Sequence, residues 1–213
     1  MLRGLLLKDL LILKKGLLMG GTILVFYSIL GIYGEGASSF SAYFLLCFSL
    51  ISISSYGYDE QARWVPYALT TTINRTKLVQ SKYLLAFFMI GLGFLCSFLL
   101  SLPYQIVQSS KFVLTISPIT WGFLYVSILF NIILLPILFK LGSENSRIII
   151  FALFGLPTIL LVILDKYNFL PVINQATIES LIKYLPYIGV ISILILGLLS
   201  YSISLRIVQK KDF

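Results

Sequence analysis

Histidine is absent from the 213-residue sequence, and cysteine occurs only twice. Without imidazole, catalytic triads built on histidine and zinc sites ligated by histidine are excluded. Cys47 and Cys96 each lie within an apolar run, which is typical of small buried side chains and not of a disulfide or a reactive thiol. A Gly-x-x-x-x-Gly-Lys-Ser/Thr loop is also missing, so the chain has no such loop to hold the phosphates of ATP. We therefore expect no catalytic residue, metal ligand or cofactor-binding residue on this chain.

Charged residues are scarce, at 11% of the chain, against roughly 25% in soluble domains. They leave six charge-free windows, and a membrane-spanning helix needs about 20 residues. The sequence therefore predicts an all-α integral membrane protein with six transmembrane helices, in a single domain over residues 1–213. The predicted spans are residues 16–34, 38–57, 83–103, 118–139, 147–164 and 185–206, with a cytoplasmic loop over 58–82.

Prolines provide the predicted helix boundaries. Pro118 and Pro186 are each expected to stand at the first position of a spanning helix, where the missing N–H has no cost. Pro103 is expected to end or kink the third span, so that residues 104–117 form a short external connection. Pro136 and Pro157 lie inside the fourth and fifth spans and predict kinks there.

The distribution of basic residues predicts the orientation in the membrane. Thirteen of the sixteen Lys and Arg residues fall at the two ends of the chain and in the second and fourth connections. Cytoplasmic segments carry the excess of basic residues in membrane proteins. Both termini are therefore predicted to be cytoplasmic. The three basic residues on the opposite side are Lys111, Lys166 and Lys183.

None of the six windows contains an ionisable residue, whereas ion-coupled transporters keep one near the middle of their spans. This argues against secondary transport. Ser49, Ser52, Ser54 and Ser55 in the second window, and Ser97 and Ser101 in the third, favour close helix packing over a substrate path. Asn131, in the fourth window, is the most polar residue deep in the predicted membrane. It fits either a substrate path or a hydrogen bond between helices.

The N-terminal segment, residues 1–15, is rich in leucine and carries interspersed basic residues. This composition suits an interfacial helix whose cations face anionic lipid headgroups. A simple basic terminus that orients the chain fits equally well.

The connection from Asp59 to Lys82 contains an aromatic and apolar group of residues that a simple tether does not need. Trp64 and Tyr67 lie one turn apart if this segment is helical, so they form a compact surface flanked by charge. Such a surface is suited to docking on another protein. The alternative is an aromatic belt resting on the membrane interface.

The chain resembles the small bacterial ABC-2 type permeases, including the group that exports phenol-soluble modulin peptides. The resemblance spans the whole chain, and its specific part runs from Glu60 through Trp64 and Tyr67 to Lys82. Two departures concern local turn geometry: Thr71-Thr72 stands where relatives usually have Leu-Pro, and Pro66 follows the tryptophan. The matching runs are Leu5-Leu6-Leu7-Lys8-Asp9-Leu10, Lys14-Lys15, Tyr58-Asp59-Glu60-Gln61-Ala62-Arg63-Trp64, Tyr67-Ala68-Leu69, Asn74-Arg75-Thr76-Lys77-Leu78-Val79 and Ser81-Lys82-Tyr83.

This resemblance implies a type V exporter-like fold in the bacterial cytoplasmic membrane, in contact with membrane lipid. It implies a permease that pairs with a second copy or with a related permease, and that binds a separate cytoplasmic ABC ATPase on which ATP and Mg²⁺ are bound. No enzymatic activity of its own and no nucleic-acid partner are expected. The second connection would be the coupling element, with the ATPase-coupling residues Glu60, Arg63, Trp64, Tyr67, Ala68 and Leu69.

Two functions follow as hypotheses. The leading one is the permease subunit of an ATP-driven exporter that moves amphipathic or hydrophobic peptides, since the spans are apolar, aromatic and uncharged. Lipids and hydrophobic drugs fit the same description. The alternative is a membrane protein that binds without transporting, either a small-molecule capture component or a peptide-immunity protein. The long aromatic and basic connection speaks against a capture component.

Overall fold

The computed structural model describes residues 2–33, 37–71, 73–108, 118–166 and 175–211, and within these ranges every regular element is a helix. The prediction of an all-α protein is confirmed for this part of the chain. The elements are α1 (Leu2–Tyr33), α2 (Ala37–Gln61), α3 (Trp64–Thr70), α4 (Arg75–Gln108), α5 (Pro118–Lys166) and α6 (Gln175–Lys210).

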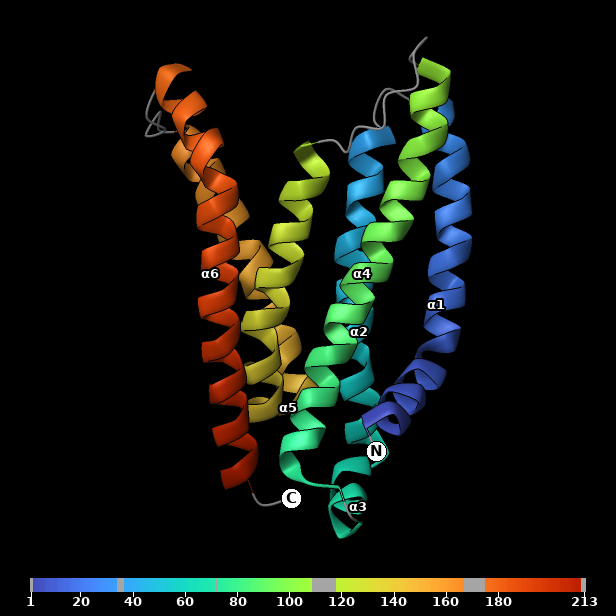
Figure 1. Cartoon of the computed structure of the whole chain (residues 1–213), viewed down its shortest axis with the longest axis vertical. Helices are drawn as coiled ribbons and strands as arrows, with labels where there is room; N and C mark the ends of the chain where they lie inside the picture. Colours follow the sequence, from blue (N-terminus) through green and yellow to red (C-terminus); the bar gives the residue numbers. More distant parts are fainter. Residues whose placement is uncertain (1, 34–36, 72, 109–117, 167–174, 212–213) are drawn as a thin grey trace.

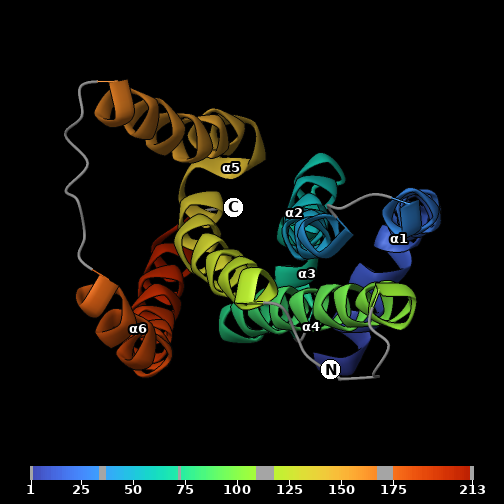
Figure 2. The ribbon, with the colours of Figure 1, turned by 90° about the horizontal axis from the view of Figure 1, so that it is seen from above.

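Helix α2 lies at the centre of the arrangement and packs against α1, α4 and α5 (Figures 1 and 2). Helix α6 lies on the other side, against α5 and α4. The short helix α3 forms the lower tip of the molecule in Figure 1, beside the start of α1 and the end of α6. All the charged contacts that build the candidate site gather at this lower end.

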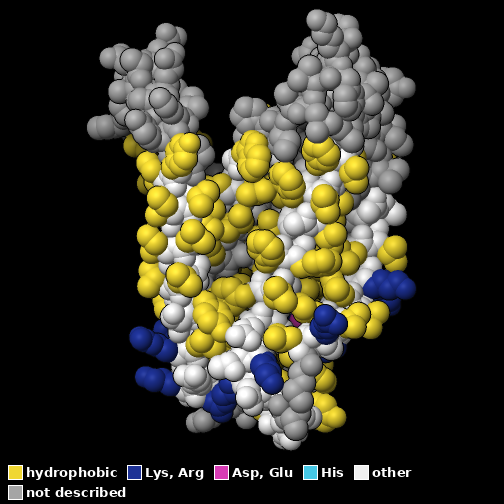
Figure 3. All heavy atoms as spheres, viewed as in Figure 1, with side chains coloured by type: hydrophobic (Ala, Val, Ile, Leu, Met, Phe, Trp, Pro, Cys, Tyr) yellow, Lys and Arg dark blue, Asp and Glu magenta, His cyan; other side chains and the backbone are white. Residues whose placement is uncertain are grey.

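Three helices are long and apolar enough to cross a membrane over the described residues: Arg75–Leu100, Ile119–Ser146 and Tyr187–Lys210. Figure 3 shows apolar side chains covering the visible sides of the bundle, with Lys and Arg gathered near its lower end. An exposed apolar belt of this extent requires a nonaqueous surrounding. Both this surface and the composition therefore indicate an integral membrane protein.

The helices are longer than several of the predicted spans, and Pro186 does not stand at a helix start. Helix α5 begins at Pro118, as predicted. Helix α4 begins at Arg75, so Lys82 lies two turns inside it, and α4 also continues past Pro103 to Gln108. Helix α6 begins at Gln175, which places Pro186 inside a helix. Proline interrupts only its own backbone hydrogen bond, and membrane helices tolerate that interruption when neighbouring groups satisfy the freed carbonyl.

Helix α5 is broken at Gly142, where φ is 82° and ψ is 176°. This break lies between Pro136 and Pro157, where kinks are predicted. This glycine divides α5 into two helical halves, and Figures 1 and 2 show the second half turning away from the first. A conformation with positive φ and ψ near 180° is accessible essentially only to glycine. The connection predicted between the spans 118–139 and 147–164 is therefore only the turn at Gly142.

The loop predicted over residues 58–82 is shorter than expected, because α2 continues to Gln61 and α4 starts at Arg75. The N-terminal segment is not a separate helix. It is the first part of α1, which bends before it continues along the bundle in Figure 1. The predicted external connections fall mostly outside the described residues, at 34–36, 109–117 and 167–174.

Candidate functional site

Helix α3 owes its position to a tight backbone turn after α2. Arg63 adopts a left-handed conformation with φ 48° and ψ 37°, and its N–H donates to the Glu60 carbonyl at 3.0 Å. Residues with a Cβ avoid this region, so the turn stores strain. Pro66 stands in the first turn of α3, where an N–H has no partner within the helix and its absence has no cost. The Thr71 N–H donates to the Ala68 carbonyl at 3.2 Å and ends the helix.

Trp64 and Tyr67 form an aromatic pair on α3, with ring centroids 5.5 Å apart. Tyr67 is 62% exposed, whereas Val65 and Ala68 on the opposite side of the helix are buried. The predicted contact between the two aromatic rings is confirmed. Helix α3 therefore presents an aromatic face outward while its small and aliphatic face packs on the bundle.

Four charged side chains from three helices form a closed charge ring (Lys8, Asp9, Asp59 and Lys82). Lys8 pairs with Asp9 at 3.0 Å and with Asp59, while Lys82 pairs with Asp9 at 3.1 Å and with Asp59. Each cation thus contacts both carboxylates, and the ring is electrically neutral. The Lys82 ammonium also donates to the Ser55 hydroxyl at 2.8 Å.

The ring is almost entirely removed from solvent. The Asp9, Asp59 and Lys82 side chains are 1%, 3% and 5% exposed, and Lys8 is 23% exposed. An isolated buried charge is very costly, so each member requires its partners. Because Asp9 belongs to α1, Asp59 to α2 and Lys82 to α4, the ring holds the lower ends of these three helices together.

The ring is directly connected to α3. The Lys8 ammonium lies 4.6 Å from the centroid of the Trp64 ring, a cation–π contact. The tryptophan therefore contacts the Lys8 ammonium with its face and packs against Tyr67 at a tilt of 47°. Trp64 thus connects α3 to the charge ring.

The six predicted ATPase-coupling residues differ in how far they are exposed to solvent. Arg63 and Tyr67 are exposed and Trp64 is partly exposed, so these three form an accessible surface. Ala68 is fully buried and Leu69 packs against the core, so these two side chains anchor α3 on the bundle. Glu60 is also exposed, and its carboxylate accepts hydrogen bonds from Ser143 on α5.

A second polar group, the amide cluster (Ser49, Ser52, Ser127 and Asn131), lies between α2 and α5. Asn131 donates to the Ser49 hydroxyl and, at 3.0 Å, to the Ser127 carbonyl. The Ser52 hydroxyl contacts the Asn131 side-chain oxygen at 3.1 Å. Of the two roles left open for Asn131, the structure places it in hydrogen bonds between helices.

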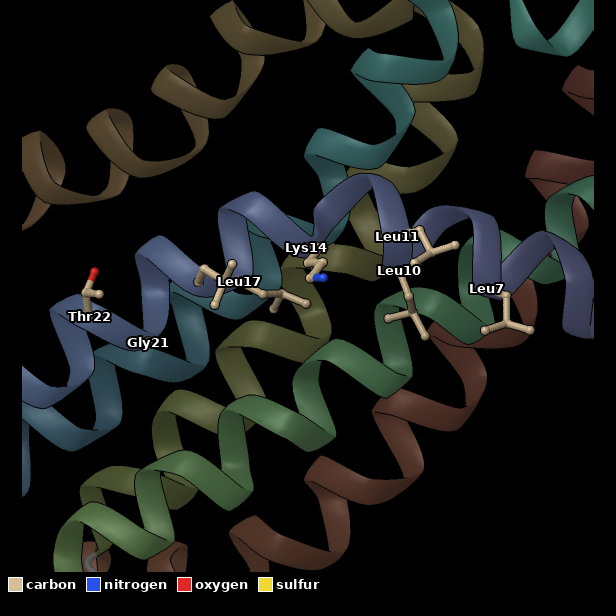
Figure 4. Close-up of a pocket in the computed structure, with 8 residues that line it drawn as sticks. Leu7, Leu10, Leu11, Lys14, Leu17, Gly21 and Thr22 are labelled. Carbon is tan, nitrogen blue, oxygen red and sulfur yellow. The ribbon is translucent and has the colours of Figure 1, made fainter.

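A groove of about 650 Å³ runs along α1 (Figure 4). Five leucines and two small residues line it together with Lys14, an exposed cation in the middle of this apolar surface. The composition suits a long apolar chain with a polar or anionic group. Its lining residues are Leu7, Leu10, Leu11, Lys14, Leu17, Leu18, Gly21 and Thr22.

Sequence reasoning missed the charge ring, whereas the break at Gly142 lies within the predicted connection between the spans 118–139 and 147–164. A signal for the ring was present: Asp59 directly follows one apolar window and Lys82 directly precedes another. Asp9 is likewise an acidic residue in a basic segment. Charges at the ends of apolar runs are normally solvated, so their pairing became apparent only when the three helices were placed together.

The fold and site define an all-helical membrane protein whose charged and aromatic contacts converge at one end. A family model described as "ABC-2 family transporter protein" matches residues 4–209. The chain belongs to this family of transporter membrane components, which are generally without catalytic activity. No curated protein and no solved structure matches the chain.

Proposed function

We propose that this chain is the membrane-spanning permease of an ATP-driven exporter, and that α3 docks on a separate ATPase subunit. The observation that carries the proposal is the exposed aromatic pair on a short helix fastened to the bundle by the charge ring. Tryptophan and tyrosine are enriched among the residues that dominate protein interfaces. Membership of the ABC-2 family supports a partner that hydrolyses ATP with bound Mg²⁺.

Six membrane crossings follow if each half of α5 crosses once. Each half has about 24 residues and is about 36 Å long at 1.5 Å per residue, enough for a hydrocarbon core of about 30 Å. Helices α1, α2, α4 and α6 supply the other four crossings. With the basic residues at the lower end in Figure 3, this end is the cytoplasmic one, and both termini lie there.

The cargo we propose is an amphipathic or hydrophobic peptide. The side chains of Ser49, Ser52 and Asn131 are used in contacts between α2 and α5, which argues against a binding site for a sugar or a metal ion there. The groove along α1 combines an apolar lining with one cation. An amphipathic chain matches both features, and the same groove would accommodate a lipid.

The transporter we propose lies in the bacterial cell membrane and contains two permeases, either two copies of this chain or this chain and a related one. The exposed faces of α5 and α6 support this assembly. Phe151 and Ile148 are 79% and 72% exposed, and Leu198 is 70% exposed. These surfaces are available to lipid and to a second permease.

Affinity capture of the tagged chain from its native membrane tests the docking role. We expect an ATPase with a phosphate-binding loop to be recovered with the chain, and Tyr67→Ala to lower that recovery at least about fivefold, the effect of losing about 1 kcal/mol. Tyr187→Ala is the matched control, because Tyr187 is 70% exposed on α6. Equal recovery with both variants would overturn the docking role of α3.

The cargo is tested on the captured complex with synthetic amphipathic peptides and with phospholipid vesicles as separate probes. We expect ATP hydrolysis to rise with the peptides in a manner that saturates. If ATP hydrolysis rises with the lipid vesicles and not with the peptides, the cargo is a lipid and not a peptide. A wild-type chain recovered without any ATPase would instead favour a protein that binds without transporting.

A further inference from the structure

Glu60 lies in the last turn of α2, and its carboxylate is bound to a different helix. Its Oε2 atom accepts the backbone N–H of Ser143 at 2.6 Å and also accepts the Ser143 hydroxyl. Ser143 is the first residue after the break at Gly142. The carboxylate therefore occupies the N-terminal end of the second half of α5.

This position is favourable for a carboxylate. The first N–H groups of a helix have no partner within the helix, and the helix dipole places partial positive charge there. Such N–H groups are usually capped by a neighbour in sequence. Here the cap comes from a residue 83 positions away, on α2.

The shape of the turn also depends on this contact. A Cβ added at residue 142 would overlap Oε1 of Glu60, so the carboxylate fits because residue 142 is glycine. Nearby, a Cβ on Gly57 would lie 3.6 Å from that of Ser143. The last turn of α2 and the break in α5 therefore form one close joint, the α5 joint (Glu60, Gly142 and Ser143).

Several side chains in the described part of the second half of α5 are largely exposed: Phe151 is 79%, Val162 68% and Leu156 66% exposed. Figure 2 shows this half leading away from α2 and α4. The α5 joint is therefore a contact that fixes the start of this half to α2.

Asp59 and Glu60 are neighbours in sequence but contact different helices. Asp59 belongs to the charge ring with α1 and α4, whereas Glu60 contacts α5. Only Gln61, Ala62 and Arg63 separate Glu60 from α3. The end of α2 next to α3 is thus connected to α1 and α4 through one carboxylate and to α5 through the next.

We propose that Glu60 is a positioning residue that transmits movement of α3 to the second half of α5. Glu60 is itself exposed, and the role proposed for it is carried by its contact with Ser143 within the permease. This inference rests on the proposed docking role of α3, but the contact between Glu60 and Ser143 is testable independently of it.

The test is hydrogen–deuterium exchange of the permease–ATPase complex, with and without ATP, Mg²⁺ and vanadate. In the wild-type chain we expect the Ser143 amide to exchange slowly, and nucleotide trapping to change exchange over both 62–70 and 143–150. In Glu60→Gln we expect Ser143 to exchange about tenfold faster, since a charge-assisted hydrogen bond is weakened. The nucleotide-linked change should persist over 62–70 and disappear over 143–150.

Two further variants separate transmission from simple loss of structure. Ser143→Ala removes the hydroxyl contact but keeps the amide contact, and should retain part of the nucleotide-linked change. Gly142→Ala displaces the carboxylate and also strains a backbone conformation that only glycine adopts, so it should disturb 143–150 at least as much as Glu60→Gln does. Gly122→Ala is its control in the first half of α5, because a Cβ there meets nothing within 4 Å.

Recovery of the ATPase distinguishes the two proposals. Glu60→Gln should retain wild-type recovery, whereas Tyr67→Ala should not. Three results overturn the inference: slow exchange of Ser143 in Glu60→Gln, an unaltered nucleotide-linked change over 143–150, or a loss of ATPase equal to that in Tyr67→Ala. If the wild-type chain recovers no ATPase, both the transmission role and the proposed function are overturned. The rate of Ser143 amide exchange in the isolated chain still tests whether the hydrogen bond between Glu60 and Ser143 exists.

Discussion

The charge ring and the amide cluster are both buried polar groups that involve α2, yet they are built from different chemistry. Ser49, Ser52, Ser55 and Asp59 follow one another at spacings of three or four residues, which places them along one side of α2. The first two contact the neutral side chain of Asn131, and the last two contact Lys82. The same side of one helix therefore changes from neutral to charged contacts toward α3.

The two groups differ in what they require of their neighbours. A neutral amide can find other partners when helices shift, so its contribution in membrane proteins is modest. Two buried carboxylates, the buried Lys82 ammonium and the partly exposed Lys8 ammonium are all satisfied only when α1, α2 and α4 meet. The end of the molecule next to α3 is therefore the end at which helix positions are most strictly linked.

We expect the largest loss of stability when one carboxylate of the charge ring is removed, because the ring then holds two cations and one anion. Asp59→Asn leaves Lys8 and Lys82 with one carboxylate, and we expect a loss of about 3 to 5 kcal/mol, as for a buried ion pair that loses one partner. Thermal unfolding of the purified chain in detergent, followed by size-exclusion chromatography, measures the loss. Lys140→Met, at an exposed cation, is the control.

A compensating variant sharpens this prediction. Asp59→Asn combined with Lys8→Met restores neutrality, so the double variant should be more stable than the sum of the two single losses predicts. Simply additive losses would show that the four charges do not act as one ring.

A smaller effect is expected at the amide cluster. Asn131→Ala removes the contacts to Ser49 and Ser52 without leaving a charge, and we expect a loss of about 1 kcal/mol. Ser54→Ala is the control, since Ser54 is exposed and donates to its own helix at 3.4 Å. A loss at Asn131 as large as that at Asp59 would remove the distinction between the two groups.

The smallest effect concerns the strained turn between α2 and α3. Arg63→Gly should stabilise the chain by about 1 kcal/mol, because glycine adopts φ 48° without a Cβ penalty. Arg63→Ala removes the same side chain but keeps the strain, so its unfolding temperature should stay below that of the glycine variant. Equal unfolding temperatures would mean that the turn is not strained in solution.

The helical class and the accessible aromatic pair were predictable because both depend on local spacing. Apolar windows predict helices, and Trp64 and Tyr67 lie one turn apart on any helix. The helix boundaries were less predictable. A proline such as Pro186 fits the first position of a helix, but it is also tolerated inside a membrane helix, and the sequence does not distinguish the two. Gly142 carried no signal of its own, since its role depends on Glu60, which lies far away in sequence.

The partners of buried charges were also beyond the sequence. Lys8, Asp9, Asp59 and Lys82 all stand near the ends of apolar runs, where solvation is the usual expectation. Which cation meets which carboxylate depends on how α1, α2 and α4 pack. Long-range pairing of this kind has no local periodicity from which to predict it.

The central claim, that α3 contacts an ATPase, is tested most directly by a photo-crosslinking amino acid placed at position 67 in native membranes. Position 187 serves as the matched control on the opposite side of the bundle. We predict a crosslink from position 67 to a protein with a phosphate-binding loop, and none from position 187. A crosslink from position 67 to lipid alone would contradict the docking role and assign the aromatic pair to the membrane interface.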